Sequence, residues 1–215
     1  MPILTIKKMN IILQNISKSY SGKKMFNDLN FKIRDSSIVT VTGKNASGKS
    51  TLLRIIVGLV QQDSGKVIYV KDNNNLPFKI AKKYIGYAGN NELIIETLTG
   101  FDYFNFIRKI YNIPKAKFKN RLKNLIDQFG IKPEVFFKYI TTYSTGYRKI
   151  TEIFGIFIHN PVVIVLDEPF NSLDADFSTI LKDYLVFLKK EQKAIIVATH
   201  NKDFINNYSD KIISL

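Results

Sequence analysis

One short segment restricts the fold of this chain more than any other. The sequence SIVTVT, residues 37–42, has the β-branched composition of a strand and ends directly at Gly43. A short turn follows, and from Lys49 onward apolar residues recur at helical spacing in KSTLLRIIVGL. A strand, a glycine-rich turn and a helix in this order are typical of an α/β fold with parallel strands.

The turn itself predicts phosphate binding. Its sequence GKNASGKST matches the pattern G-x-x-x-x-G-K-[ST], in the strand-to-helix context that the pattern requires. Glycines let backbone N–H groups wrap phosphates at a helix N-terminus, a lysine reaches the β- and γ-phosphates, and a serine hydroxyl binds Mg²⁺. A glycine-rich turn with a chance lysine is the alternative, and the flanking strand and helix argue against it. The predicted residues are Gly43, Lys44, Asn45, Ala46, Ser47, Gly48, Lys49, Ser50 (also the metal ligand) and Thr51.

Two carboxylates end a second strand. The segment VVIVLDE, residues 162–168, is apolar up to Asp167, as expected for a strand buried on both faces of a parallel sheet. Open α/β sheets bind ligands at the carboxyl ends of their strands. We expect Asp167 to hold Mg²⁺ through water and Glu168 to polarise the attacking water in phosphoryl transfer. Asp-Glu-Pro could also simply end a strand, but the phosphate pattern upstream makes that reading poor.

A histidine ends a third strand. His200 follows AIIVAT, and a lone histidine in such a place is more often structural than catalytic. A strand end parallel to the other two would nevertheless aim His200 at the same nucleotide.

The composition is that of an ordinary globular protein. The 215 residues predict one domain, and 45% of them are hydrophobic. The absence of cysteine excludes disulfides and thiolate metal sites. No apolar run reaches the roughly 18 residues of a membrane span, the N-terminal segment MPILTIKKMNIIL lacks a signal-peptide cleavage site, and Met9 is an alternative start to Met1. The net charge of +14 invites nucleic acid or an anionic membrane as partner, but the lysines are scattered and decide little.

The remaining patterns predict strands at both ends of the chain and helices between them. Strands are expected at residues 10–16, 29–33, 66–70, 84–89 and 211–215, and a loop at 71–77. Helices are expected at residues 99–112, 115–130, 147–160 and 176–190.

Several motifs together carry a family resemblance. The phosphate loop, VIVLDEP, NSLD, ATH and a short serine–glycine motif before the acidic strand resemble the ATP-binding cassette (ABC) ATPases. The resemblance covers essentially the whole chain, in the family's motif order. It implies an α/β P-loop NTPase fold, with a RecA-like mixed sheet and N-terminal antiparallel strands. It also implies a single domain over residues 1–215, with the core at 1–89 and 160–215 and a helical subdomain inserted at about 90–159.

The resemblance assigns further roles. It implies that Tyr20 stacks on adenine, that Asp174 belongs to the loop that communicates across a dimer, and that His200 senses the γ-phosphate. The alternative for Tyr20 is a half-buried tyrosine at a strand end. Where the family has a glutamine that links Mg²⁺ to the membrane contact, this chain has Asn90, whose shorter stem favours a water bridge; its alternative role is a turn residue.

The signature segment also departs from the family. The usual Leu-Ser-Gly-Gly-Gln is Tyr143-Ser144-Thr145-Gly146-Tyr147 here, so the serine and the second glycine remain. We expect Ser144 and Gly146 to clamp the phosphates of a partner's ATP, because the N-terminus of a helix attracts anions. Thr145 and Tyr147 have no explanation from the sequence.

The resemblance implies a subunit that binds ATP and Mg²⁺, hydrolyses ATP and dimerises head to tail with a second ABC ATPase subunit. The leading hypothesis is a cytoplasmic ATPase, peripheral on the inner face of the cell membrane, that contacts the membrane only through a separate transmembrane permease subunit. The chain resembles short exporter-type cassettes such as the haem exporter ATPase, although its sequence is equally compatible with other small exporters.

Two alternatives remain open. One is a soluble ABC protein that acts on nucleic acid or ribosomes. A single cassette, no sustained heptads and no zinc cysteines argue against it. The other is a degenerate cassette without useful turnover, against which Lys49, Asp167, Glu168 and His200 all count.

Overall fold

The computed structural model describes residues 8–89 and 94–215. Within them the chain divides into two compact units. The first, here called the sheet unit, comprises Met1–Tyr87, Pro161–Glu168 and Leu185–Leu215. The second, the helical unit, comprises Ala88–Asn160 and Pro169–Tyr184.

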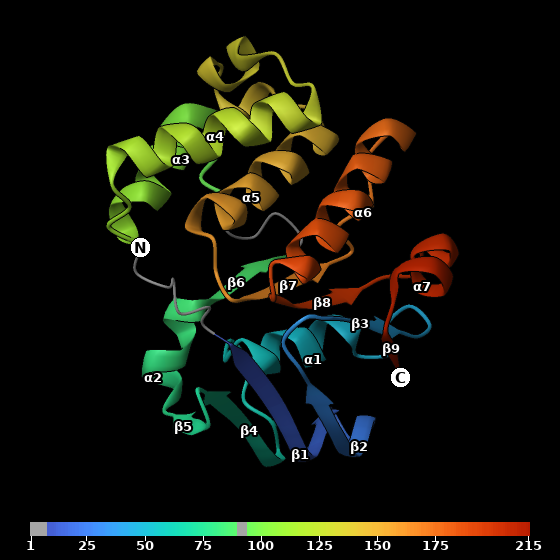
Figure 1. The fold of residues 1–215 in the computed structure, drawn as a ribbon. Helices are drawn as coiled ribbons and strands as arrows, with labels where there is room; N and C mark the ends of the chain where they lie inside the picture. The colour runs from blue at the N-terminus through green and yellow to red at the C-terminus, as the bar shows by residue number, and fades with distance from the viewer. Residues whose placement is uncertain (1–7, 90–93) are drawn as a thin grey trace. The chain divides into compact units, whose positions relative to one another are not determined.

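The sheet unit contains an antiparallel sheet formed by the first part of the chain. Its strands are β1 (Met9–Tyr20), β2 (Lys23–Ile33), β4 (Ser64–Lys71) and β5 (Asn74–Leu76), in the order β2-β1-β4-β5 (Figure 1). In β1, Ile11 and Leu13 are buried and their neighbours less so, which is the alternation of a strand with one face in the core.

A second sheet carries the phosphate-loop strand in its interior. Its strands are β3 (Ser37–Thr42), β6 (Ile85–Ala88), β7 (Val163–Asp167), β8 (Ala194–Ala198) and β9 (Lys211–Ser214), in the order β6-β7-β8-β3-β9. β3 pairs in parallel with both β8 and β9, and β7 pairs in parallel with β8. Every residue of β7 and β8 is buried, so these strands are covered on both faces, as their apolar sequences predict.

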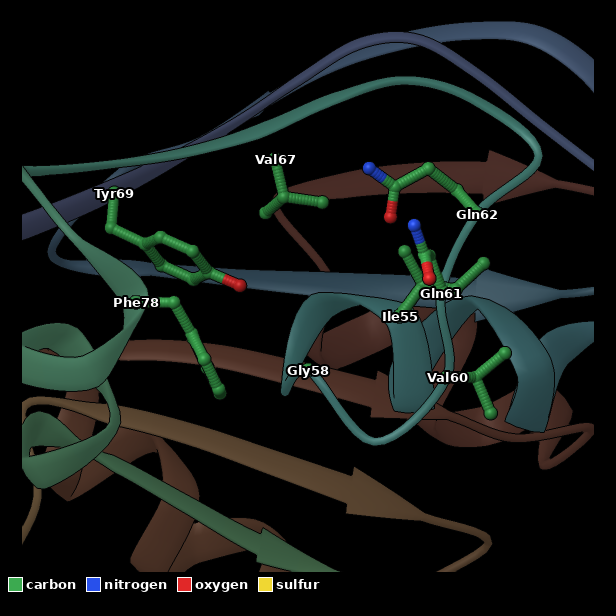
Figure 2. A pocket seen from close by; sticks show the side chains of 8 residues that line it. All are labelled: Ile55, Gly58, Val60, Gln61, Gln62, Val67, Tyr69 and Phe78. Atoms are coloured by element: carbon green, nitrogen blue, oxygen red, sulfur yellow. The ribbon is translucent and has the colours of Figure 1, made fainter.

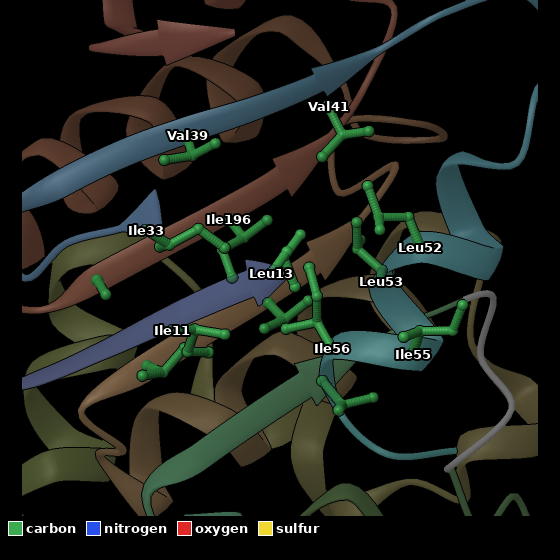
Figure 3. Close-up of a cluster of buried hydrophobic side chains, with 14 of the residues drawn as sticks. Ile11, Leu13, Ile33, Val39, Val41, Leu52, Leu53, Ile55, Ile56 and Ile196 are labelled. Carbon is green, nitrogen blue, oxygen red and sulfur yellow. The ribbon is translucent and has the colours of Figure 1, made fainter. Parts of the chain in front are cut away.

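The two sheets and helix α1 (Lys49–Ile56) share one hydrophobic core. Figure 3 shows Val39, Val41 and Ile196 of the parallel sheet facing Ile11 and Leu13 of the antiparallel sheet. Side chains of α1 lie among them. Because its side chains are buried in this core, α1 is held in place at the end of the phosphate loop. The unit also contains the short helix α2 (Phe78–Ala81), the turn η1 (Lys82–Tyr84) and α7 (Lys202–Tyr208).

The helical unit is built around packed aromatic rings. Its elements are α3 (Gly100–Ile110), α4 (Lys115–Phe129), the short turns η2 (Pro133–Phe137) and η3 (Ile140–Thr142), and α5 (Thr145–His159). Both α3 and α4 pack against α5 (Figure 1). Phe154 of α5 lies within ring contact of Phe104, Phe129 and Phe136, so α5 is the central helix. Helix α6 (Ala175–Lys190) begins in this unit and ends in the sheet unit.

The predicted fold class is confirmed, but some local predictions were wrong. The loop expected at residues 71–77 contains β5, which pairs with β4 through Tyr69 and Leu76. Helices α2 and α7 were not predicted, because four and seven residues are too few to establish a helical period. Among the described residues, no helix combines the length and apolarity that crossing a membrane requires.

Candidate functional site

The phosphate loop connects β3 to α1 through a tight turn. The backbone N–H of Ser47 donates to the carbonyl of Lys44 at 3.1 Å, and Ala46 has a left-handed φ of 60°. The first bond of the helix runs from Leu52 N to Gly48 O, at 2.8 Å. The N–H groups at the start of α1 therefore face the loop, which creates an anion-binding position at a helix N-terminus.

Both loop glycines are required by the local geometry. A Cβ at Gly43 would lie 2.5 Å from Ser47 Oγ and 2.6 Å from the carbonyl oxygen of Leu215. Gly48 has a φ of 103°, and a Cβ there would approach Phe26 to 3.3 Å. The glycines of the sequence pattern therefore serve close backbone packing.

Lys49 is placed to bind an anion at this loop. Its side chain is buried, and its ammonium donates to the carbonyls of Gly43 at 3.0 Å and Lys44 at 3.2 Å. A phosphate oxygen lying in the loop can take these donors. Ser50 follows on the first turn of α1, as the pattern requires, and Ser47 Oγ has no hydrogen-bond partner within the described part of the chain.

The acidic pair and the histidine lie in the same unit as the phosphate loop. Asp167 is the last residue of β7 and is 2% exposed. Glu168 leaves the strand with a left-handed φ of 45°, and its N–H donates to Ala198 O at 2.8 Å. This conformation turns the glutamate side chain toward β8, where Oε1 lies 3.1 Å from Nδ1 of His200.

The three strand ends are tied together by backbone bonds. Thr199 N, directly after β8, donates to Val41 O of β3 at 3.1 Å, just before the phosphate loop. The parallel order β7-β8-β3 therefore brings Asp167, Glu168 and His200 to the sheet edge where the loop begins. Glu168 Oε2 is buried and has no hydrogen-bond partner among the described residues, so it remains able to accept a hydrogen bond from water.

Tyr20 ends β1 in this unit, and its side chain is 46% exposed. Tyr20 pairs across the hairpin with Lys23 of β2. Phe26, also on β2, lies 3.3 Å from where a Cβ at Gly48 would be. Asn90, the predicted metal residue, lies outside the described residues, which stop at Gly89 and resume at Ile94.

A hollow of about 260 Å³ lies at the opposite end of α1 from Lys49. Figure 2 shows the rings of Tyr69 and Phe78 on one side of it and Gln61 and Gln62 on the other. The Tyr69 hydroxyl is already bound to Ile56 O at 2.9 Å. The hollow contains none of the predicted site residues and is separate from the phosphate loop.

In the helical unit, the signature segment begins helix α5. Ser144 is the N-cap, and its Oγ accepts a hydrogen bond from Tyr147 N at 3.3 Å. The tyrosine that replaces the family's glutamine packs edge-on against Phe177 and against Tyr143, at ring distances of 6.0 and 6.3 Å. Tyr147 thus serves aromatic packing at the helix start. Nothing in the structure explains Thr145.

Gly146 lies against the loop that contains Asp174. A Cβ at Gly146 would come 2.6 Å from the carbonyl oxygen of Ser172, whose own φ is 67°. Asp174 Oδ1 accepts a hydrogen bond from Phe177 N at 2.8 Å and so caps α6. The signature segment and the Asp174 loop are therefore in direct contact within one unit.

A buried ion pair follows the signature segment. Lys149 and Glu152 are 6% and 1% exposed, and Lys149 Nζ lies 3.3 Å from Glu152 Oε2. Both also hold the backbone of Gly89, since Lys149 donates to its carbonyl at 2.6 Å and Glu152 Oε1 accepts from its N–H at 3.2 Å. Sequence reasoning missed this pair, although lysine and glutamate three residues apart in an apolar helix were a visible signal.

A phosphate loop between a parallel strand and a helix, with an acidic pair at a neighbouring strand end, defines a P-loop nucleotide-binding domain. Residues 26–171 match the family model described as "ABC transporter". The chain therefore belongs to the ABC transporter family and is an ATP-binding cassette ATPase domain.

Individual proteins support this placement. The chain is 29% identical over 205 residues to the uncharacterized ABC transporter ATP-binding protein YhcH of Bacillus subtilis (strain 168), covering 94% of this chain and 66% of the relative. The chain spans about two thirds of the length of this relative and of a second Bacillus subtilis relative, YdbJ.

Solved structures share the fold. One is titled "Structure of ATP binding subunit of ABC transporter", with a TM-score of 0.85, 22% identity, and coverage of 95% of this chain and 85% of the other. Another is the dimeric structure of a post-hydrolysis state of the ATP-binding cassette MJ0796 bound to ADP and Pi. Its TM-score is 0.82 at 21% identity, and it covers 95% of this chain and 94% of the other.

Proposed function

We propose that this chain binds and hydrolyses ATP as the nucleotide-binding subunit of a transporter. The observation that carries the proposal is the meeting of three strand ends in the sheet unit. They bring the loop that starts at Gly43, the pair Asp167 and Glu168, and His200 to one edge of the parallel sheet.

The chain's own groups fit phosphoryl transfer. Lys49 and the N–H groups of the loop bind and orient the β- and γ-phosphates. Glu168 accepts a hydrogen bond from the attacking water through a carboxylate oxygen and holds it in line with the γ-phosphate. His200, at 3.1 Å from Glu168, fixes the orientation of that carboxylate and contacts the γ-phosphate.

The residues present also fit Mg²⁺. The ion prefers oxygen ligands, keeps several waters and needs only one or two protein groups, which the Ser50 hydroxyl and the Asp167 carboxylate would supply. In residues 8–89 and 94–215 no group of three or more His, Cys, Asp or Glu side chains could hold a metal by itself, so Ser50 and Asp167 would hold the ion together with oxygen ligands from outside the chain. When bound, Mg²⁺ neutralises charge on the phosphates. Asn90 is proposed to contribute through water.

The proposed active unit is a head-to-tail dimer. Ser144, Gly146 and the free N–H groups at the start of α5 would bind the γ-phosphate of the partner's ATP. Asp174 would act in the adjoining loop, and Tyr20 would stack on adenine. The solved relative whose title calls it a dimer with ADP and Pi supports this arrangement.

The work done by the dimer is proposed to be transport. The names of the chain's relatives, which include ABC transporter ATP-binding proteins, support a separate membrane permease as the partner. A structural neighbour titled as part of the ABC transporter complex cbiONQ gives the same support. The chain would then lie at the cytoplasmic face of the cell membrane and touch it only through that permease. The division into a core at 1–89 and 160–215 and a helical insert at about 90–159 forms part of this proposal.

Glu168→Gln tests the proposal most directly. The amide keeps the shape of the side chain but lowers its basicity, so ATP should be bound and not hydrolysed, and a dimer should accumulate on size-exclusion chromatography with MgATP. Lys49→Ala is the matched control, because it removes the phosphate ligand and should leave a monomer that does not bind ATP. A Glu168→Gln protein that binds MgATP yet stays monomeric would refute the dimer mechanism.

A further inference from the structure

The end of β1 is irregular just before Tyr20. The pairing of β1 with β2 shifts register between Ile16 and Lys18 and again between Lys18 and Ser19. The pairing of β1 with β4 also shifts before Ser17. A regular ladder therefore does not determine where the Tyr20 side chain points, and other contacts must hold it.

Asp63, which precedes β4, supplies those contacts. Its N–H donates to Ser17 O at 2.9 Å, its Oδ2 accepts from Ser19 N at 2.7 Å, and its Oδ1 accepts from Lys18 Nζ at 2.6 Å. Three consecutive residues of the irregular strand end are thus bound to one aspartate. The hydrogen bond from Lys18, followed by that from Ser19, lowers the pKa of the Asp63 carboxyl below its ordinary value, so this clamp on the strand end keeps its negative charge to lower pH than an unpaired aspartate.

The same lysine also contacts the tyrosine. Lys18 Nζ lies over the Tyr20 ring, 5.1 Å from its centroid, in the geometry of a cation–π interaction. The Lys18 side chain is only 14% exposed, whereas Tyr20 is 46% exposed. One face of the ring is therefore taken by the ammonium, and a flat aromatic ligand can stack on the other face.

We propose that Asp63, acting through Lys18, is a positioning residue that sets Tyr20 for the base of the nucleotide. This inference rests on the proposed ATP-binding function and extends it to residues that control affinity for the base. The distance from Tyr20 to the phosphate loop is suitable, because Tyr20 pairs with Lys23, and Phe26 lies 3.3 Å from where a Cβ at Gly48 of the phosphate loop would be. Three residues of strand span about 10 Å, which a nucleotide can bridge between its base and its phosphates.

The test compares MgATP with inorganic tripolyphosphate, which carries the phosphates without a base. Asp63→Asn keeps the side-chain shape and weakens the clamp. MgATP affinity should fall about fivefold, because the tyrosine ring is less well held for stacking on the base, and tripolyphosphate affinity should stay unchanged. Tyr20→Ala should show the same selectivity with a larger loss. Lys18→Arg should retain MgATP affinity, because arginine also pairs with Asp63 and lies over an aromatic ring.

A matched control exists in the same unit. Lys71 pairs with Asp72 and lies over the Tyr84 ring at 5.4 Å, so Asp72→Asn breaks an equivalent pair away from Tyr20. It should leave both affinities unchanged, and thermal unfolding should show each variant to be folded.

The outcomes separate two failures. The positioning role would be overturned if Asp63→Asn lowered the affinities for MgATP and tripolyphosphate equally, or lowered neither. An unchanged MgATP affinity in Tyr20→Ala would also overturn it. Tripolyphosphate and MgATP binding that survive Lys49→Ala would instead overturn the phosphate-loop assignment on which the inference rests.

Discussion

Gly146→Ala tests whether the signature segment and the Asp174 loop must be in contact. The added Cβ would lie 2.6 Å from Ser172 O, with the next atoms at 3.7 and 3.9 Å, so one backbone atom receives the whole clash. Restoring an ordinary contact of 3.4 Å displaces the loop by about 0.8 Å. Such overpacking costs about 1–3 kcal/mol, and the higher helix propensity of alanine offsets up to about 1 kcal/mol of it.

The net change in unfolding free energy should therefore be small, between about 0 and 2 kcal/mol. The effect on turnover should be much larger, because a misplacement of about 1 Å can cost roughly 100-fold in rate. The affinity of the monomer for ATP should not change, since its own phosphate loop belongs to the other unit and the signature segment is proposed to bind only the ATP of a partner. Phosphate release, binding of a fluorescent ATP analogue and urea unfolding measure the three quantities separately.

Gly155→Ala, on the same helix, is the control. The three atoms nearest to its Cβ would all belong to the Tyr103 side chain, at 3.0–3.3 Å, so it disturbs packing without pressing on Ser172. It should destabilise the protein by a comparable amount and keep its turnover. Wild-type turnover in Gly146→Ala, or equal loss of turnover in both variants, would refute the reasoning.

Three further outcomes follow from the structure. Lys149→Met should lower the free energy of unfolding by about 3–5 kcal/mol in urea, because it leaves the buried Glu152 charge without its ion pair, and a loss below about 1 kcal/mol would contradict this. Burial raises the pKa of Tyr69 from 10.0 to about 12, so the fold favours its neutral form. That contribution, on the order of 3 kcal/mol, is complete below pH 10 and is lost as the pH rises through about 12, which unfolding series of the wild type and Tyr69→Phe should show. Gly43→Ala should abolish ATP binding in calorimetry, because its Cβ would lie 2.5 Å from Ser47 Oγ.

The sequence predicted the elements that carry chemistry better than the contacts that support them. Gly43 and Asp167 stand in long patterns with a fixed physical meaning, a glycine turn before a helix and an apolar run that ends in acids. These patterns are local, so one stretch of chain is enough to recognise them.

Asp63 and Ser172 show what the sequence could not supply. The partners of Asp63 lie 44 and 45 residues earlier in the chain, and an aspartate in a turn carries no sign of them. Gly146 was predicted to clamp the phosphates of a partner's ATP, and the sequence carried no sign of its neighbour within this chain, Ser172 O, 26 residues later. Strand β5 was missed for a related reason: its three residues form a strand only because β4 lies beside them.

The position of β3 in its sheet has a consequence for synthesis on the ribosome. Within the described part of the chain, β3 pairs with β8 and β9 alone, and Val39 lies opposite Ile196 and Lys211. When residues 37–51 leave the exit tunnel, neither neighbouring strand has yet been made. β3, the strand that leads to the phosphate loop, therefore remains unpaired while the whole helical unit is translated. Pairing of β3 with strands so far along the chain is slow, and until then this apolar strand can pair with wrong partners. A ligand for the nascent chain, ATP included, could therefore bind only after the last strands have joined the sheet.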